Sequence, residues 1–113
     1  MKFDFVIGNP PYQETVDTYN RQDPIYPHFY EAAERLADRY LLISPARFLF
    51  DSGLTKRTWN RKMLSDEHIV VEKYYRKSSD VFINTNINGG VVIIYRDSTK
   101  KADLLIFLFL MKH

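Results

Sequence analysis

Short apolar runs separated by polar stretches mark most of the chain. Several of these runs end at Gly or Pro, and their length is that of a strand. The run at residues 40–44 has almost no polar position, which predicts a strand buried on both faces. The strands that we expect are 3–8, 40–44, 68–75 and 91–95.

Two helices are expected between these strands. Apolar residues recur at spacings of 3 and 4 from Phe29 to Tyr40, with charged residues between them, as on an amphipathic helix. Asp23-Pro24 can begin this helix, and Pro27 is tolerated in its first turn. A weaker apolar stripe with a basic polar face predicts a second helix over residues 53–65. We expect exposed loops at 13–22 and 77–88.

The order strand, helix, strand, helix, strand, loop, strand is typical of an α/β fold with helices between the strands. We expect about four strands, mostly parallel, with one antiparallel strand, since no helix separates the last two. The 113 residues suffice for a single domain, which we assign to residues 1–97. Residues 98–113 are an apolar tail, either a buried element or a poorly ordered end.

Composition excludes several classes of protein. The chain has no cysteine, so disulfide scaffolds and cysteine-ligated metal sites are ruled out. No apolar run reaches the roughly 18 residues of a membrane helix, and no signal peptide opens the sequence, so we expect a cytoplasmic protein without a membrane partner. The acidic residues show no metal-ligand spacing, and we expect no metal site. The aromatic content of 15% fits either a dense core or a surface that stacks planar ligands.

Basic residues gather in the middle of the chain. From Arg47 to Lys77 there are eight basic and four acidic residues, whereas the overall net charge is only +2. Such a stretch forms either a solvated helix face or a surface that meets phosphates. Arg57, Arg61 and Lys62 lie together on the second expected helix and are our candidates for contacts with a nucleic-acid backbone.

The loop after the first strand carries the most informative residues, Asn9-Pro10-Pro11-Tyr12. Two consecutive prolines make the loop stiff and keep it out of a helix or a ladder. The Asn9 side chain and the Pro10 carbonyl are acceptors, and the ring of Tyr12 can lie over a planar ligand. Acceptors beside an aromatic ring suit an exocyclic amino group on a flat base, whose nitrogen lone pair they direct outward.

Residues 3–12 (Phe-Asp-Phe-Val-Ile-Gly-Asn-Pro-Pro-Tyr) resemble the catalytic motif of amino-directed methyltransferases, above all the DNA adenine-N6 methyltransferases. Ser44-Pro45, Asp80-Val81-Phe82 and Gly89-Gly90-Val91-Val92-Ile93 resemble the methylase part of type IIG restriction-modification enzymes. The resemblance covers about residues 3–97. The loop motif alone is shared with protein-glutamine and some RNA methyltransferases, so it indicates amino methylation more firmly than it indicates the substrate.

The resemblance implies roles for the matching residues. Asn9 and Pro10 would accept hydrogen bonds from the N6 amino group of a flipped adenine, Tyr12 would stack on the base, and Pro11 would contact it. Flipping is required because this nitrogen cannot be reached inside a duplex. Phe82 would cover the opposite face of the base, or else belong to the core. We assign three further ring-bearing residues to structural or solvated positions: Trp59 to the helix core, and His28 and His68 to sites without a catalytic role.

One expected part of the family pattern is missing. Such enzymes bind S-adenosylmethionine on a Gly-x-Gly loop, and none of the four glycines here stands in that pattern. We therefore expect a partial Rossmann-like sheet, the C-terminal half of a catalytic domain that is inactive alone. A missing N-terminal half or another chain would supply the cofactor site. The open edge of the first strand would also permit a homodimer.

The sequence thus predicts part of a site-specific DNA methyltransferase of a restriction-modification system. Its reaction would move a methyl group from S-adenosylmethionine to adenine N6. The alternatives are an RNA or protein-glutamine methyltransferase fragment, and a non-catalytic module that binds DNA or protein. Binding of labelled S-adenosylmethionine would separate the enzyme from the module.

Overall fold

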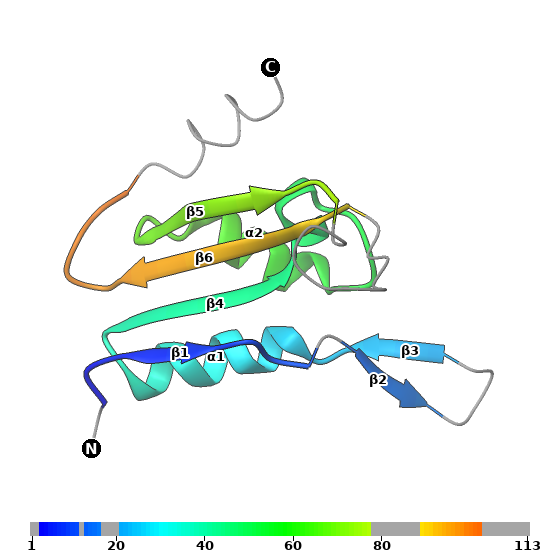
Figure 1. Ribbon diagram of the computed structural model, residues 1–113, viewed down its shortest axis with the longest axis horizontal. Helices are drawn as coiled ribbons and strands as arrows, with labels where there is room; N and C mark the ends of the chain where they lie inside the picture. The colour runs from blue at the N-terminus through cyan, green and yellow to red at the C-terminus, as the bar shows by residue number, and fades with distance from the viewer. Residues whose placement is uncertain (1–2, 12, 17–20, 78–88, 103–113) are drawn as a thin grey trace.

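The computed structural model describes residues 3–11, 13–16, 21–77 and 89–102, with only the backbone at 13–16 and 21–23. A four-stranded sheet forms its centre, in the order β1-β4-β6-β5 (Figure 1). The strands are β1 (Val6–Gly8), β4 (Arg39–Pro45), β5 (Ile69–Tyr75) and β6 (Val91–Asp97).

The sheet is mixed. β1 pairs in parallel with β4, whereas β6 lies between β4 and β5 and is antiparallel to both. The expected antiparallel relation of the last two strands is confirmed. The expectation of a mostly parallel sheet is wrong, since two of the three strand pairings are antiparallel. The reason is that β6, which runs opposite to the other strands, lies between β4 and β5. A local pattern of apolar residues does not reveal that a strand inserts between two earlier ones.

A second, two-stranded sheet corrects another expectation. β2 (Gln13–Val16) and β3 (Arg21–Pro24) form an antiparallel hairpin where we expected a loop over 13–22. These strands are mostly polar, so the apolar alternation that reveals a strand is absent. Because Pro24 belongs to β3, Asp23-Pro24 does not begin the first helix. The hairpin projects beyond the end of the main sheet (Figure 1).

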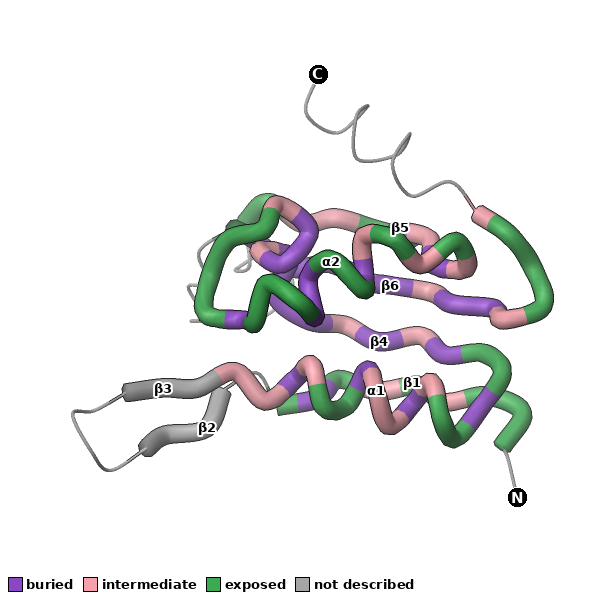
Figure 2. The backbone as a smooth tube through the Cα atoms, turned by 180° about the vertical axis from the view of Figure 1, so that it is seen from behind, coloured by how far each residue is buried: buried purple, intermediate pink, exposed green. Residues whose placement is uncertain are grey.

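Both helices pack on one face of the main sheet (Figure 2). α1 (Tyr26–Leu36) begins two residues later than Pro24, with a proline in its first turn, and α2 (Arg57–Ser65) begins later than expected. The delay of α2 follows from the preceding loop, in which Asp51 and Gly53 have positive φ. A short 3-10 helix, η2 (Arg47–Phe50), joins β4 to this loop.

The core beneath the helices is strongly aromatic. Tyr26 and Tyr30 of α1 meet Phe48 of η2 and Trp59 of α2, and the rings of Phe48 and Trp59 have centroids 4.9 Å apart. All four side chains are buried among the apolar residues of β4, β5 and β6. Part of the high aromatic content therefore forms a dense core, and the assignment of Trp59 to the helix core is confirmed.

The other face of the sheet carries no helix within the described residues (Figure 1). Alternation along the strands places Ile7, Leu41 and Tyr95 in one row across that face, in register with one another. The ring of Phe5 stacks on Tyr95 with centroids 6.3 Å apart. This face and the edge strand β1 are therefore apolar surfaces.

No helix among the described residues is long and apolar enough to cross a membrane.

Two core tyrosines make the folded state less stable as the pH rises in the alkaline range. Burial raises the pKa of Tyr26 to about 12, and burial, with Asp66 and Glu34 nearby, also raises the pKa of Tyr40. The unfolded value is about 10, so the fold favours the neutral phenols. Their stabilising contribution is complete below pH 10 and is lost as the pH rises towards 12. We expect the urea midpoint to fall between pH 9 and pH 11, and to fall less in Tyr40→Phe. Equal midpoints at the two pH values would contradict this.

Candidate active-site loop and the surrounding edge of the sheet

The Asn9-Pro10-Pro11 loop leaves the carboxyl end of β1. In the parallel pairing Gly8 lies opposite Leu42, so β1 ends three residues before β4 does. β5 runs in the same direction as β4, since both are antiparallel to β6. The carboxyl ends of β1, β4 and β5 therefore lie at one edge, where ligands bind in open α/β sheets.

The two acceptors of the loop belong to residues of different exposure. Asn9 is exposed, whereas Pro10 beside it is buried and Pro11 is exposed again. Neither the Asn9 side chain nor the Pro10 carbonyl has a hydrogen-bond partner among the described residues. The buried proline anchors the loop while the asparagine faces outward. Tyr12 and Phe82, the two expected stacking residues, lie outside the described residues.

Ser44-Pro45 closes β4 beside the loop. Ser44 is buried, its hydroxyl lies 2.8 Å from that of Tyr30 in α1, and it donates to the Pro45 carbonyl at 3.2 Å. The Ser44 hydroxyl is thus engaged in hydrogen bonds within the fold, and its bond to Tyr30 holds α1 against the end of β4. Ser44 is therefore a structural support of the edge and does not face a ligand.

Gly89-Gly90 brings the start of β6 to the same edge. Both residues have positive φ, and a Cβ on Gly90 would collide with the carbonyl oxygen of Tyr75 at the end of β5. The Gly90 carbonyl accepts a hydrogen bond of 3.0 Å from the Ala46 amide, directly after β4. Glycine is required because the two strand ends approach so closely.

The comparison with known families identifies the protein family of the chain. The model of the Eco57I restriction-modification methylase family matches residues 1–82, more than half of the chain. The chain belongs to this family. No curated protein matches it, and no solved structure does. The match spans the Asn9-Pro10-Pro11-Tyr12 loop and the basic helix α2, and it confirms the resemblance to restriction-modification methylases at the level of the family.

The three basic candidates of this methylase do not form one patch. Arg57 and Arg61 are exposed and one helical turn apart on α2. Lys62 is turned towards α1, where its ammonium lies 3.2 Å from the Glu34 carboxylate. Arg57 and Arg61 are thus available to a partner, whereas Lys62 must leave an ion pair to bind one.

Sequence reasoning missed the polar network that fixes the loop before α2 in the methylase. Asn60 is buried, donates to the Asp51 carboxylate at 3.0 Å and accepts from the Thr55 hydroxyl at 2.6 Å. The signal was weak, because an asparagine inside a basic helix looks solvated. This network holds the loop over residues 51–55 beside the carboxyl edge of the sheet.

A buried ion pair was also missed. The Arg96 guanidinium donates to the Asp66 carboxylate at 2.8 Å and lies 3.5 Å from Glu34. Burial alone would lower the pKa of Arg96, but the bond to Asp66 and the charge of Glu34 raise it. The pair joins β6 to the end of α2 and to α1 at the edge opposite the loop. Within the described residues, no group of three acidic or histidine side chains could hold a metal ion.

Proposed function

We propose that this chain supplies the base-binding part of a DNA adenine-N6 methyltransferase. One observation carries the proposal: in a restriction-modification methylase, two unoccupied acceptors extend from the carboxyl end of a strand on a stiff proline loop. The Asn9 side-chain oxygen and the Pro10 carbonyl would each accept one hydrogen of an exocyclic amino group. The nitrogen lone pair would then point away from the loop, ready to attack a methyl group.

The target nitrogen must leave the duplex to reach this loop. A flipped base exposes its amino group and both faces of its ring. Tyr12 and Phe82 would stack on those faces, each contact contributing about 1–3 kcal/mol. The resemblance of residues 3–12 to adenine-N6 enzymes favours adenine as the base, and the family favours DNA as the polymer.

S-adenosylmethionine is the methyl donor that the resemblance implies, but the residues of this chain do not fit a site for it. The glycines are Gly8, Gly53, Gly89 and Gly90, and none is part of a Gly-x-Gly loop. Gly53 packs against the Arg47 side chain, and Gly90 against Tyr75, so they serve local packing. We propose that an N-terminal half of the catalytic domain or another chain supplies the donor site beside the Asn9 loop.

Mapping methylated bases in cells tests the proposal with the natural partner in place. Native genomic DNA from cells that carry the gene is sequenced for modified bases, beside DNA from cells with the chromosomal Asn9→Ala variant. We expect N6-methyladenine to disappear at one recognition sequence. Unrelated methylated sequences in the same genome serve as the internal control. Unchanged adenine methylation at every sequence would contradict the proposal and leave the RNA and protein-glutamine alternatives.

The exposed face of α2 makes a separate prediction. If Arg57 and Arg61 contact DNA phosphates, replacing both by Gln should reduce the slope of log affinity against log salt by about 0.9 for each lost contact. Lys62→Gln is the matched control on the same helix, and its effect should be smaller because Lys62 is already paired with Glu34. Fluorescence anisotropy with a labelled duplex at several salt concentrations measures the slope. An unchanged slope in the double variant would show that Arg57 and Arg61 form a solvated helix face that does not contact phosphates.

A further inference from the structure

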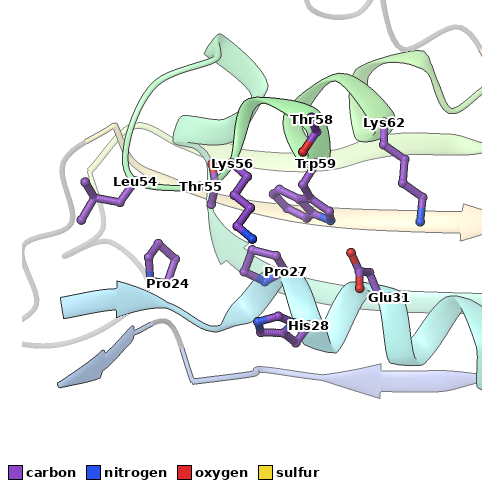
Figure 3. A pocket seen from close by; sticks show the side chains of 10 residues that line it. All are labelled: Pro24, Pro27, His28, Glu31, Leu54, Thr55, Lys56, Thr58, Trp59 and Lys62. Atoms are coloured by element: carbon purple, nitrogen blue, oxygen red, sulfur yellow. The ribbon is translucent and has the colours of Figure 1, made fainter. Parts of the chain in front are cut away.

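A cavity of about 670 Å³ opens between the amino-terminal halves of α1 and α2 (Figure 3). Pro27 and His28 of α1 line one side, and Thr58 and Trp59 of α2 line the other. The volume is in the range of cavities that hold small molecules. Both helix starts follow the carboxyl ends of strands, α1 after β1 through the hairpin and α2 after β4, so the cavity lies towards the ligand-binding edge of the sheet.

Trp59 brings an unsatisfied hydrogen-bond donor to this cavity. The side chain is only 6% exposed, and its indole Nε1 has no hydrogen-bond partner among the described residues. Figure 3 shows the indole in the space between the helices, flanked by Glu31 and Lys62. Buried donors are almost always paired, because an unpaired one loses its hydration without compensation. An acceptor that enters here and displaces a flanking side chain would complete the site.

The start of α2 adds further donors on the same side. The residue before the helix, Lys56, is extended, and no side chain caps the first turn, which also contains no acidic residue. The first amide groups of the helix therefore carry partial positive charge without a side-chain acceptor. The side chains of Lys56 and Lys62 both line the cavity. Backbone amides, ammonium groups and an indole together favour an oxyanion.

We propose that this cavity binds a phosphate group at the start of α2. The Glu31 carboxylate in the same cavity repels an anion, which directs the phosphate towards Lys56 and the helix amides. Lys62 can join only by leaving Glu34, so Lys56 is the principal cation of the site. The binding of phosphate stands on the geometry alone; that the phosphate belongs to a DNA backbone rests on the proposed function.

The chain contains a single tryptophan, which makes the test direct. Trp59 emission is recorded while inorganic phosphate is added at constant ionic strength, with chloride as the reference salt. We expect a saturable change in emission with phosphate and none with chloride. Lys56→Gln should weaken phosphate binding about tenfold, since a charge-assisted contact is lost. Lys100→Gln is the matched control and should bind like the wild type, because Lys100 is exposed and follows the end of β6, at the edge of the sheet opposite the end of β4.

A second variant separates the indole donor from folding. Trp59→Phe keeps a ring in the core but removes the Nε1 donor, and phosphate should then raise its melting temperature less than that of the wild type. An absence of any phosphate-dependent change in the folded wild type would overturn the proposal. So would equal binding by Lys56→Gln and the wild type.

The source of the phosphate is settled by two further titrations. A short DNA duplex and adenosine monophosphate are compared with inorganic phosphate in the same emission assay. Tighter binding of the duplex, weakened by Lys56→Gln, assigns the site to a nucleic-acid backbone, whereas tighter binding of the monophosphate assigns it to a free nucleotide. A duplex that binds without changing Trp59 emission overturns the backbone assignment. None of these readouts depends on methyl transfer, so the failure of this proposal and that of the proposed function can be told apart.

Discussion

Asn9→Ala is expected to lower the rate of methyl transfer by about 10²–10³, the usual cost of removing one hydrogen-bonding group that acts in the transition state. The variant loses the side-chain acceptor for the amino hydrogens, while the buried Pro10 still anchors the loop. Asn9 is exposed, so its truncation should leave the fold intact. The assay uses the methylase purified under native conditions through a tag on this chain, so that the polypeptide supplying the donor site is present.

Two further variants make the result specific. Asn9→Asp keeps an acceptor oxygen at the same place and should retain more activity than Asn9→Ala. Tyr12→Ala should remove about 1–3 kcal/mol of stacking, which appears mainly as weaker retention of the flipped base. Lys100→Ala is the surface control and should match the wild type. Rates within threefold of wild type for Asn9→Ala and Tyr12→Ala together would remove both residues from the catalytic assignment.

The positions of the central elements along the chain were predictable from their apolar residues, but the burial of those residues was predictable only in part. The run at residues 40–44, apolar except for Ser44, is β4, but the expected burial of both its faces is wrong, because Leu41 and Ile43 lie on the face without a described helix and are only half-buried. The stripe from Phe29 onwards marks α1, although Phe29 and Leu36 are exposed and the buried residues of the helix are Tyr26, Tyr30 and Ala33. The hairpin β2–β3 was missed because its strands are mostly polar, and the position of β6 was missed because pairing across the sheet is a long-range property. Local patterns locate helices and strands, but they do not show which apolar residues the rest of the fold covers.

The candidate site shows the same division. The Asn9 loop could be found because its chemistry is contiguous in the sequence and its rigidity comes from two adjacent prolines. The cavity at the start of α2 could not, since it joins residues about 30 positions apart, such as His28 and Thr58, through the packing of two helices. Lys62 looked like a neighbour of Arg61 in the sequence, but the turn of the helix directs it to Glu34.

The edge of the sheet at β1 is the place where we expect the chain to meet a partner. β1 pairs only with β4, so its other edge offers unpaired backbone groups among the described residues. Ile7 on this strand is 72% exposed, and Phe3 and Phe5 are exposed beside it. An apolar edge strand invites pairing with another chain. In the methylase we propose that the polypeptide carrying the donor site pairs here; in its absence a second copy can do so.

We therefore expect the isolated chain to form a two-fold dimer at micromolar concentration, measured by sedimentation equilibrium against the 13.4 kDa monomer mass. Ile7→Lys places a charge on the edge strand and removes from each copy an isoleucine side chain that the dimer would bury, at about 1.5–3 kcal/mol per side chain. Two copies lose this contribution, so the dimer should weaken on the order of a hundredfold or more. Leu54→Lys is the matched control, because Leu54 is 65% exposed but lies in the loop before α2. It should leave the dimer unchanged. A wild-type chain that sediments as a monomer, or equal weakening by the two variants, would show that β1 is not the interface.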